Sequence, residues 1–231
     1  MEKKHKNILI IAATTLEINP LIGHLQEAYA RLSEQELLFE GKGLKIRVEI
    51  CGIGLMATAF NLGRVLNTGT FDYVIQLGIA GAYPNPQIDL GAIVYVQAER
   101  IGDLGASTKE GNFLPLVQIG LEEASAGTLP GHPPAGLSGF LQQFLPAEGI
   151  SVNHISGDPA GRNHFAIASE TIVVESMEGA ALHYVCSALE VPFVQIRSIS
   201  NWVEPRDKSR WQMGLALQNL NKTAIALLQH L

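Results

Sequence analysis

Six apolar runs, each about as long as a β-strand, recur along the chain and constrain its fold more than any other feature. Most are continuous rather than alternating, which is typical of strands covered on both faces. The runs occupy residues 8–13, 45–50, 73–78, 92–98, 171–175 and 192–198. Helical spacing of apolar residues lies between several runs and after the last. This alternation predicts an α/β fold with a mixed or largely parallel sheet.

Length and composition favour one soluble domain. A chain of 231 residues that is 47% hydrophobic can bury one large core. Its net charge of −6 argues against nucleic acid or an acidic membrane surface as a partner, and no run is long enough to span a membrane. The two cysteines, Cys51 and Cys186, lie in apolar runs without metal-ligand spacing. We therefore expect a cytoplasmic protein without a metal site.

One segment interrupts the α/β pattern. Residues 124–139 are rich in Gly, Pro and small side chains, and an apolar pattern resumes over 140–145. This composition indicates a loop or lid inserted within the domain, at about residues 106–150, rather than a linker between two domains.

A glycine pattern, GxGxxA, follows the second apolar run and opens a predicted helix at residues 51–60. With Asp72 near the place of a ribose-binding acid, it allows a dinucleotide-binding interpretation. However, that fingerprint usually follows the first strand of its domain, and Asp72 begins a strand rather than ending one. We favour the simpler interpretation, in which Gly52 and Gly54 permit a tight turn.

A second glycine cluster stands at the end of the third run, where ligands bind in open α/β sheets. Its small residues would let a flat ligand approach the backbone, although a simple turn explains them equally well. The candidate substrate-binding residues here are Gly78, Ile79, Ala80 and Gly81.

Two carboxylates stand at junctions between strands and helices. Glu17 follows the first run in the first turn of a predicted helix, where a helix N-terminus favours any acid. Glu178 lies where an apolar strand gives way to a helix of small residues. Acids that converge at strand ends are typical of acid/base or cation-stabilising sites. Arg197, near the end of the last run, needs a carboxylate or ligand partner, and pairing with Glu175 or Glu178 is compatible with a direct role.

In their order, the segments AATTLEINPL, CGIG, GIAGA, AERIGDLG, SMEGAA and VPFVQIRSISN resemble the purine nucleoside phosphorylase and methylthioadenosine nucleosidase superfamily over nearly the whole chain. The resemblance implies a three-layer α/β/α single domain with a mixed central sheet and no cofactor. It also implies a small-molecule nucleoside substrate and a homodimer or higher homo-oligomer.

The same resemblance implies roles for individual residues. Glu17 matches the general base of the nucleosidases, and Arg197 matches an arginine that positions the attacking water. Met177 and Glu178 match the pair that holds the ribose. Phosphorylases carry arginine loops for phosphate, whereas TTLEINP has no basic residue, so water is the implied nucleophile.

The base-binding end departs from the methylthioadenosine enzymes, which carry Asp where this chain has Asn201. An amide NH2 can donate to the N7 and O6 acceptors of a 6-oxopurine, so Asn favours hypoxanthine as the leaving base. The nearby residues Ser200 and Trp202 are further candidates for substrate binding. Family nucleosidases stack an aromatic residue on the base after a Ser-Gly-Asp turn; here Phe165 or Trp202 would replace it.

Within the superfamily, these features most resemble the futalosine hydrolases, which release hypoxanthine and dehypoxanthinyl futalosine in menaquinone biosynthesis. Candidate cations for the aryl carboxylate of futalosine are Arg162, Arg206, Lys208 and Arg210. Three alternatives remain open: a methylthioadenosine/S-adenosylhomocysteine nucleosidase that tolerates Asn201, a phosphorylase, and a non-catalytic nucleoside sensor.

Overall fold

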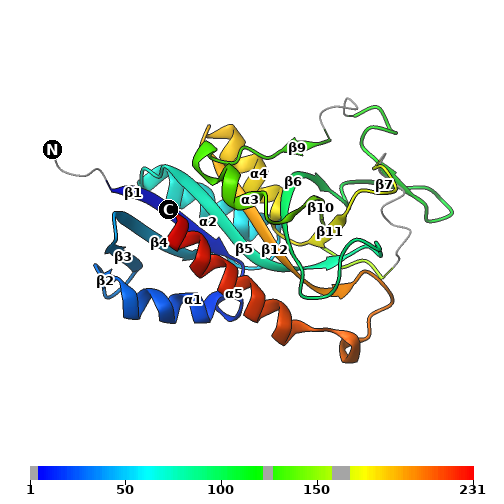
Figure 1. The fold of residues 1–231 in the computed structure, drawn as a ribbon. Helices are drawn as coiled ribbons and strands as arrows, with labels where there is room; N and C mark the ends of the chain where they lie inside the picture. Colours follow the sequence, from blue (N-terminus) through cyan, green and yellow to red (C-terminus); the bar gives the residue numbers. More distant parts are fainter. Residues whose placement is uncertain (1–4, 122–126, 158–166) are drawn as a thin grey trace.

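A computed structural model describes residues 5–121, 127–157 and 167–231, and a mixed β-sheet runs through its centre (Figure 1). Each of the six predicted apolar runs forms a strand of this sheet, as the sequence predicts. These strands are β1 (Lys6–Ala12), β4 (Leu44–Ile50), β5 (Tyr73–Ala82), β6 (Ile93–Ile101), β11 (Val173–Ser176) and β12 (Phe193–Trp202).

The sheet closes on itself at one end. Its order is β11-β10-β6-β12-β5-β1-β4-β3-β2, and β11 pairs a second time with β5. Strands β5, β12, β6, β10 and β11 therefore form a ring, which brings residues far apart in sequence to one end of the fold. The remaining strands of this sheet are β2 (Ala30–Arg31), β3 (Leu37–Gly41), β9 (Leu129–Pro130), which pairs with β6, and β10 (Leu145–Ser151).

Helices cover both faces of the sheet and complete three layers (Figure 1). On one side lie α1 (Thr15–Ala28) and α5 (Met213–His230), which pack on each other. On the other lie α2 (Leu55–Thr68) and α4 (Gly179–Ala188). The predicted fold class is therefore confirmed. Among the described residues, no helix is both long and apolar enough to cross a membrane.

The continuous apolar runs are explained by burial on both faces of the sheet. In β1, Ile8 and Ile10 pack into the core beneath α1 and α5, whereas Leu9 and Ile11 belong to the cluster beneath α2 and α4. Successive strand side chains point to opposite faces, so a strand covered on both sides needs apolar residues at every position.

The predicted insertion at 106–150 is wrong at its C-terminal end. Residues 145–150 belong to β10, which lies between β6 and β11 in the sheet. The strand pattern of β10 is weak in the sequence because a glycine interrupts it at Gly149. A side chain cannot stand there, because a Cβ would collide with the buried carboxylate of Glu99. The rest of the segment includes β7 (Gly105–Ser107), β8 (Phe113–Pro115), the 3-10 turn η1 (Ala135–Leu137) and α3 (Ser138–Leu141). The interpretation of residues 124–139 as a loop or lid stays a prediction, and residues 122–126 lie outside the described residues.

Candidate active site

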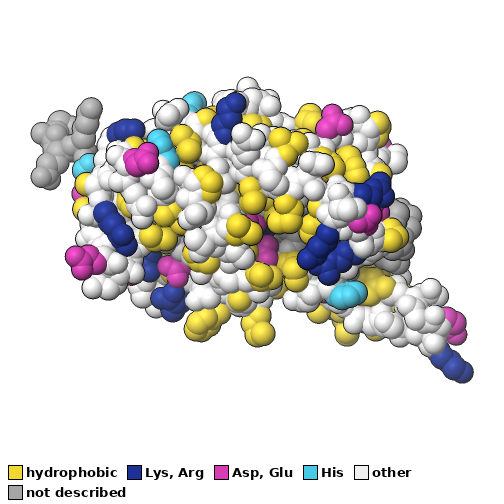
Figure 2. Space-filling view, turned by 90° about the horizontal axis from the view of Figure 1, so that it is seen from below, with side chains coloured by type: hydrophobic (Ala, Val, Ile, Leu, Met, Phe, Trp, Pro, Cys, Tyr) yellow, Lys and Arg dark blue, Asp and Glu magenta, His cyan; other side chains and the backbone are white. Residues whose placement is uncertain are grey.

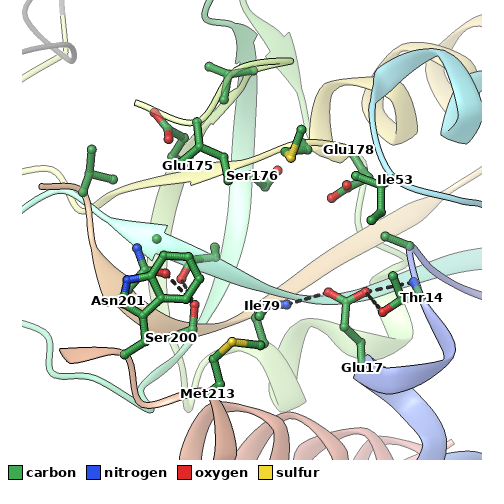
Figure 3. Close-up of a pocket in the computed structure, with 18 of the residues that line it drawn as sticks. Thr14, Glu17, Ile53, Ile79, Glu175, Ser176, Glu178, Ser200, Asn201 and Met213 are labelled. Carbon is green, nitrogen blue, oxygen red and sulfur yellow. Dashed lines mark hydrogen bonds between the residues drawn. The ribbon is translucent and has the colours of Figure 1, made fainter. Parts of the chain in front are cut away.

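A cavity of about 290 Å³ lies where the ends of β1, β5, β11 and β12 meet (Figure 3). Apolar side chains form much of its wall, and polar groups gather at two ends. The apolar wall includes Leu16, Ile53, Val152, Met177, Met213 and Leu217. Of the predicted substrate-binding residues, Met177, Ile79, Ala80, Gly81 and Ser200 line the cavity, together with Glu17, Glu178 and Asn201.

Glu17 is fixed at the first polar end by both oxygens of its carboxylate. Thr14, which caps α1, donates to Oε2 from its backbone N (3.0 Å) and its Oγ1 (3.1 Å). The backbone N of Ile79 donates to Oε1 at 3.1 Å. Burial raises the pKa of Glu17, and the positive charge of Arg197 partly opposes that rise. A rigid carboxylate with a raised pKa suits a general base.

Glu178 caps the start of α4 and faces the same end of the cavity (Figure 3). Its Oε1 accepts from the backbone N of Gly54 at 3.2 Å, and its Oε2 lies 3.6 Å from Nη1 of Arg197. Gly52 and Gly54 have φ values of +86° and +94°, which only glycine adopts at little cost. The glycine turn thus directs the N–H of Gly54 at Glu178. Asp72, the ribose-binding acid of the dinucleotide interpretation, accepts instead from the backbone N of Asn7.

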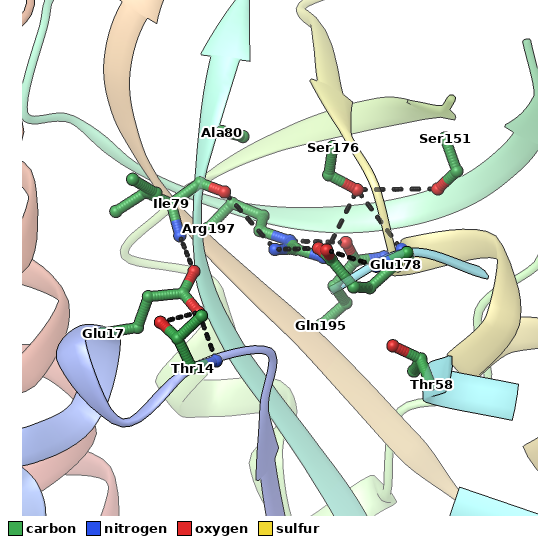
Figure 4. A network of polar contacts seen from close by, with 12 residues as sticks. Thr14, Glu17, Thr58, Ile79, Ala80, Ser151, Ser176, Glu178, Gln195 and Arg197 are labelled. Carbon is green, nitrogen blue, oxygen red and sulfur yellow. Dashed lines mark hydrogen bonds and ion pairs between the residues drawn. The ribbon is translucent and has the colours of Figure 1, made fainter. Parts of the chain in front are cut away.

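Arg197 lies behind the floor of the cavity rather than in its wall. It is 1% exposed and donates to Oε1 of Gln195 (2.8 Å), the carbonyl of Ile79 (3.3 Å) and Oγ of Ser176 (3.3 Å) (Figure 4). A Cβ on Gly78 would collide with this guanidinium, so the predicted binding residue Gly78 makes room for Arg197. Of the two glutamates predicted as its partner, Glu175 and Glu178, Arg197 pairs with Glu178.

A buried polar network continues from Arg197 and escaped the sequence analysis. Because Gln195 accepts from Arg197 through Oε1, its Nε2 must donate to Oε1 of Glu99 (3.0 Å) and to Nε2 of His183 (3.1 Å). His183 then carries its proton on Nδ1, which donates to the carbonyl of Leu129 at 2.9 Å. Burial lowers the pKa of His183 to about 4, so the ring is neutral.

Glu99 is fully buried, and burial raises its pKa to about 7. Its Oε2 accepts from Oγ of Ser151 at 3.0 Å, and that hydroxyl accepts from the backbone N of Ala180 at 2.8 Å. Glu99 is therefore tied to the first turn of α4, which Glu178 caps. The available signal in the sequence was a glutamate directly after the apolar run 92–98, still within β6.

Asn201 marks the opposite polar end. Oγ of Ser200 donates to its Oδ1 at 2.7 Å, and its Nδ2 donates to the carbonyl of Trp202 at 3.0 Å. Glu175 lines the same end, where it accepts from Tyr83 Oη (3.0 Å) and from the backbone N of Ser156 (2.9 Å). Glu175 and Asn201 both pair with Gly81, so the three residues lie side by side across β11, β5 and β12.

The tryptophan at this cavity is Trp211 and not the predicted Trp202. Trp202 lies outside this cavity and borders a separate hollow with Pro84, Asn85, Pro86 and Glu204. The register of β12 shifts between Ile199 and Asn201, and side chains alternate after that irregularity, so Trp202 turns away when Asn201 faces the cavity. Trp211, which the sequence analysis did not select, lines the cavity instead. Phe165 lies outside the described residues.

Among the described residues that line the cavity, none is Lys or Arg. Arg206 lies over the ring of Trp211, 5.8 Å from its centroid, in an adjoining hollow that shares Asn201 and Met177 with the cavity. Arg210 pairs with Glu204 at 2.9 Å. Lys208 begins the 3-10 turn η3 (Lys208–Arg210), and Arg162 lies outside the described residues. Within the described part of the chain, no cluster of three metal-ligating side chains occurs.

The chain is similar over nearly its whole length to proteins of one known superfamily. The family model described as the phosphorylase superfamily matches residues 7–231. A futalosine hydrolase from Thermus thermophilus is 32% identical over 227 residues, covering 95% of this chain and 94% of that relative. A second futalosine hydrolase, from Streptomyces coelicolor, is 31% identical over 153 residues, covering 65% of this chain and 62% of that relative.

Other matches carry a different name or show the fold alone. A 5'-methylthioadenosine/S-adenosylhomocysteine nucleosidase from Maridesulfovibrio salexigens is 27% identical over 241 residues, covering 96% of this chain and 98% of that relative. A futalosine hydrolase mutant from Helicobacter pylori aligns with a TM-score of 0.77, covering 98% of this chain and 100% of that one. At 16% identity it supports the fold only.

Proposed function

We propose a function from the premise that this chain belongs to the phosphorylase superfamily, whose family model it matches over residues 7–231. The chain is an N-glycosyl hydrolase that cleaves a purine nucleoside with water, and its substrate is futalosine, from which it releases hypoxanthine and dehypoxanthinyl futalosine. The observation that carries this proposal is one cavity with Glu17 and Glu178 at one end and Asn201 at the other.

Water is the nucleophile in this proposal. A phosphorylase must hold a phosphate dianion, which needs cations or a cluster of N–H donors. The described residues lining the cavity include no Lys or Arg, and Glu17 directs a carboxylate into the space. A carboxylate repels phosphate but can take a proton from water. The raised pKa of Glu17 brings it nearer the pH at which a general base works well.

Glu178 acts on the ribose. Breaking the N-glycosidic bond creates positive charge on the sugar, so hydrogen bonds from its hydroxyls to a carboxylate strengthen in the transition state. Gly54 donates to Oε1 of Glu178, and Arg197 lies within ion-pair distance of Oε2, so both oxygens keep acceptor sites for hydroxyls. Met177 packs beside the same sugar. Arg197, from behind the floor, pairs with Glu178 and places positive charge near Glu17, so it acts on the attacking water through these two carboxylates.

The leaving base lies at the end formed by Asn201, Gly81 and Glu175. Oδ1 of Asn201 accepts from Ser200, and one hydrogen of its NH2 group goes to the carbonyl of Trp202, so the second hydrogen is left to donate to N7 or O6 of a 6-oxopurine. The N1–H of such a base is a donor, which a free lone pair of Glu175 can accept. An aminopurine presents an acceptor at N1 and a donor at its amine, so it fits these two side chains less well.

A methylthioadenosine or S-adenosylhomocysteine nucleosidase is the second candidate. The apolar wall of Leu16, Ile53, Met213 and Leu217 suits a short thioether as well as an aryl group. Relatives that carry that name match the full length of this chain. A non-catalytic nucleoside sensor is the third candidate, which saturable binding without turnover would favour.

A substrate panel tests the proposal. Purified protein is given futalosine, methylthioadenosine and inosine, and the released base is identified by chromatography. We expect hypoxanthine from futalosine at a kcat/KM at least tenfold above that for adenine release from methylthioadenosine. Rapid adenine release with inert futalosine would move the assignment to the second candidate.

The surface also favours a homodimer as the working form. Large hydrophobic side chains are exposed around the cavity mouth and the adjoining helices, and hydrophobic groups gather along one edge of the space-filling view (Figure 2). Exposed residues include Leu16, Ile53, Met56, Phe60 and Tyr184. Two of them, Leu16 and Ile53, also line the cavity, so a second copy seated there would cover its mouth. Sedimentation analysis tests this, and a monomer at micromolar concentration would contradict it.

A further inference from the structure

Helix α1, which carries Glu17, is broken one residue after it. Ile18 has φ −127° and ψ 15°, which are not helical, and Pro20 lies inside the helix. Proline lacks an N–H and its ring displaces the carbonyl four residues earlier, so a regular helix cannot run through this point. The break leaves the carbonyl of Glu17 and the N–H of Leu21 without the bond to each other that a regular helix would form.

Asn221 of α5 supplies both missing partners. Its Oδ1 accepts from the backbone N of Leu21 at 3.0 Å, and its Nδ2 donates to the carbonyl of Glu17 at 2.8 Å. The second hydrogen of Nδ2 goes to the carbonyl of Leu217 at 2.8 Å. All these bonds fix the orientation of the amide, because a flipped amide would set NH2 against the N–H of Leu21.

This side chain is only 3% exposed although it stands in the middle of a helix, where asparagine is a poor helix former. Loss of any of its three hydrogen bonds would leave a buried polar group without a partner and destabilise the fold at this point. They join two segments separated by 200 residues in sequence.

We propose that Asn221 is a positioning residue for Glu17: its amide replaces the broken helical bond and so fixes the backbone from which the carboxylate reaches the cavity. The proposal rests on the role of Glu17 in the function proposed above. Thr14 and Ile79 hold the oxygens of Glu17, and Asn221 holds its backbone, so the carboxylate is fixed from α5 as well as from β5 and its own cap.

The test compares Asn221→Ala with Asn219→Ala, a matched control. Asn219 is also an asparagine of α5, and its Nδ2 donates to the carbonyl of Gly91 at 2.8 Å, away from the cavity. A displacement of about 1 Å at a catalytic group can cost on the order of 100-fold. We expect Asn221→Ala to lower kcat by roughly 10- to 100-fold with KM within about threefold of wild type. Asn219→Ala should keep the wild-type kcat. Equal kcat values for the two variants would overturn the proposal.

A Glu17→Gln background separates positioning from general loosening. Glutamine cannot take the proton, so a residue that acts through Glu17 has nothing left to position. We expect Asn221→Ala to lower the residual kcat of Glu17→Gln by less than about twofold, which is the signature of coupled residues. A further drop as large as in the wild-type background would show that Asn221 acts elsewhere.

If Asn221→Ala does not fold, Asn221→Asp serves instead. Its carboxylate still accepts from Leu21 but cannot donate to the carbonyl of Glu17 until it is protonated. The ratio of its kcat to that of wild type should therefore rise as the pH is lowered. A ratio that stays constant across pH would overturn the proposal.

A measurement without turnover keeps this proposal separate from the proposed function. Carbon-13 NMR of glutamate-labelled protein follows the titration of the Glu17 carboxyl, whose pKa burial raises. Asn221→Ala should lower that pKa because a loosened carboxyl gains water, whereas Asn219→Ala should leave it unchanged. If wild-type protein cleaves no nucleoside, the proposed function fails. An unchanged pKa in Asn221→Ala would refute the positioning role.

Discussion

Replacing Glu178 by glutamine removes the negative charge that, in the proposed mechanism, stabilises the cationic sugar. The carboxylate accepts from Gly54 and lies 3.6 Å from Nη1 of Arg197, and the side chains of the pair are 8% and 1% exposed. At an effective dielectric constant of about 20, two unit charges at that separation attract by roughly 5 kcal/mol before desolvation is counted. The substituted glutamine loses that attraction, and an amide that still accepts from Gly54 sets its NH2 toward Arg197.

The catalytic cost follows from the sugar hydroxyls. A hydrogen bond to a charged acceptor contributes about 1.5–3 kcal/mol, against about 0.5–1.5 for a neutral one. Two ribose hydroxyls therefore lose about 2–3 kcal/mol, and the weaker stabilisation of the cationic sugar brings the total to about 3 kcal/mol. That total corresponds to roughly a 150-fold fall in kcat. Stability should fall as well, because Arg197 keeps its bonds to Gln195, Ile79 and Ser176 but loses its charged partner at a buried place.

Steady-state kinetics with the preferred nucleoside measure this effect, and urea unfolding checks that the variant folds. Glu49→Gln is a matched control: Glu49 lies in β4, and its Oε1 pairs with Arg64 at 2.7 Å, away from the cavity. We expect its kcat to match that of wild type. A folded Glu178→Gln variant with a kcat within threefold of wild type would refute the role given to Glu178.

Four further predictions concern single groups. Asn201→Asp should move the ratio of kcat/KM values for adenine and hypoxanthine nucleosides toward adenine by at least tenfold, and an unchanged ratio would remove Asn201 from base recognition. Because burial raises the pKa of Glu17 and the base must be ionised, kcat/KM should fall with decreasing pH at a midpoint above the ordinary glutamate pKa of 4.5; a limb at or below that value would contradict the assignment. Glu99 has a pKa of about 7 when folded and 4.5 as its ordinary value, so the folded state holds a proton that the unfolded state has lost, and stability falls as pH rises between them. Urea unfolding at pH 5 and 8 should show a smaller fall for Glu99→Gln than for wild type, and equal falls would be inconsistent with that pKa. Trp211→Ala should raise KM at least fivefold, whereas Trp202→Ala should change it less than twofold, and the reverse order would restore Trp202 to the site.

The sequence predicted the sheet where burial on both faces leaves continuous apolar runs, as in β1, β5 and β12. It missed β10 because Pro146, Glu148 and Gly149 interrupt the apolar pattern there. The reason for Gly149 is a buried carboxylate on the neighbouring strand, which no local pattern can reveal.

The candidate site divides in a similar way. Glu17 and Glu178 carry local signals because each stands where a strand gives way to a helix. The network of Glu99, Gln195 and His183 depends on contacts between residues up to 96 positions apart, so single-sequence reasoning could not assemble it. Trp202 misled as a candidate because it lies next to Asn201 in sequence but on the opposite side of β12, and Phe165 stays a prediction.

The central claim is hydrolysis by water without phosphate. The most direct measurement is the reaction with futalosine in water enriched in oxygen-18, run with and without inorganic phosphate and analysed by mass spectrometry. The account predicts one labelled oxygen on the anomeric hydroxyl of the sugar product and the same rate in both conditions. Cleavage that requires phosphate and gives an unlabelled sugar 1-phosphate would contradict it.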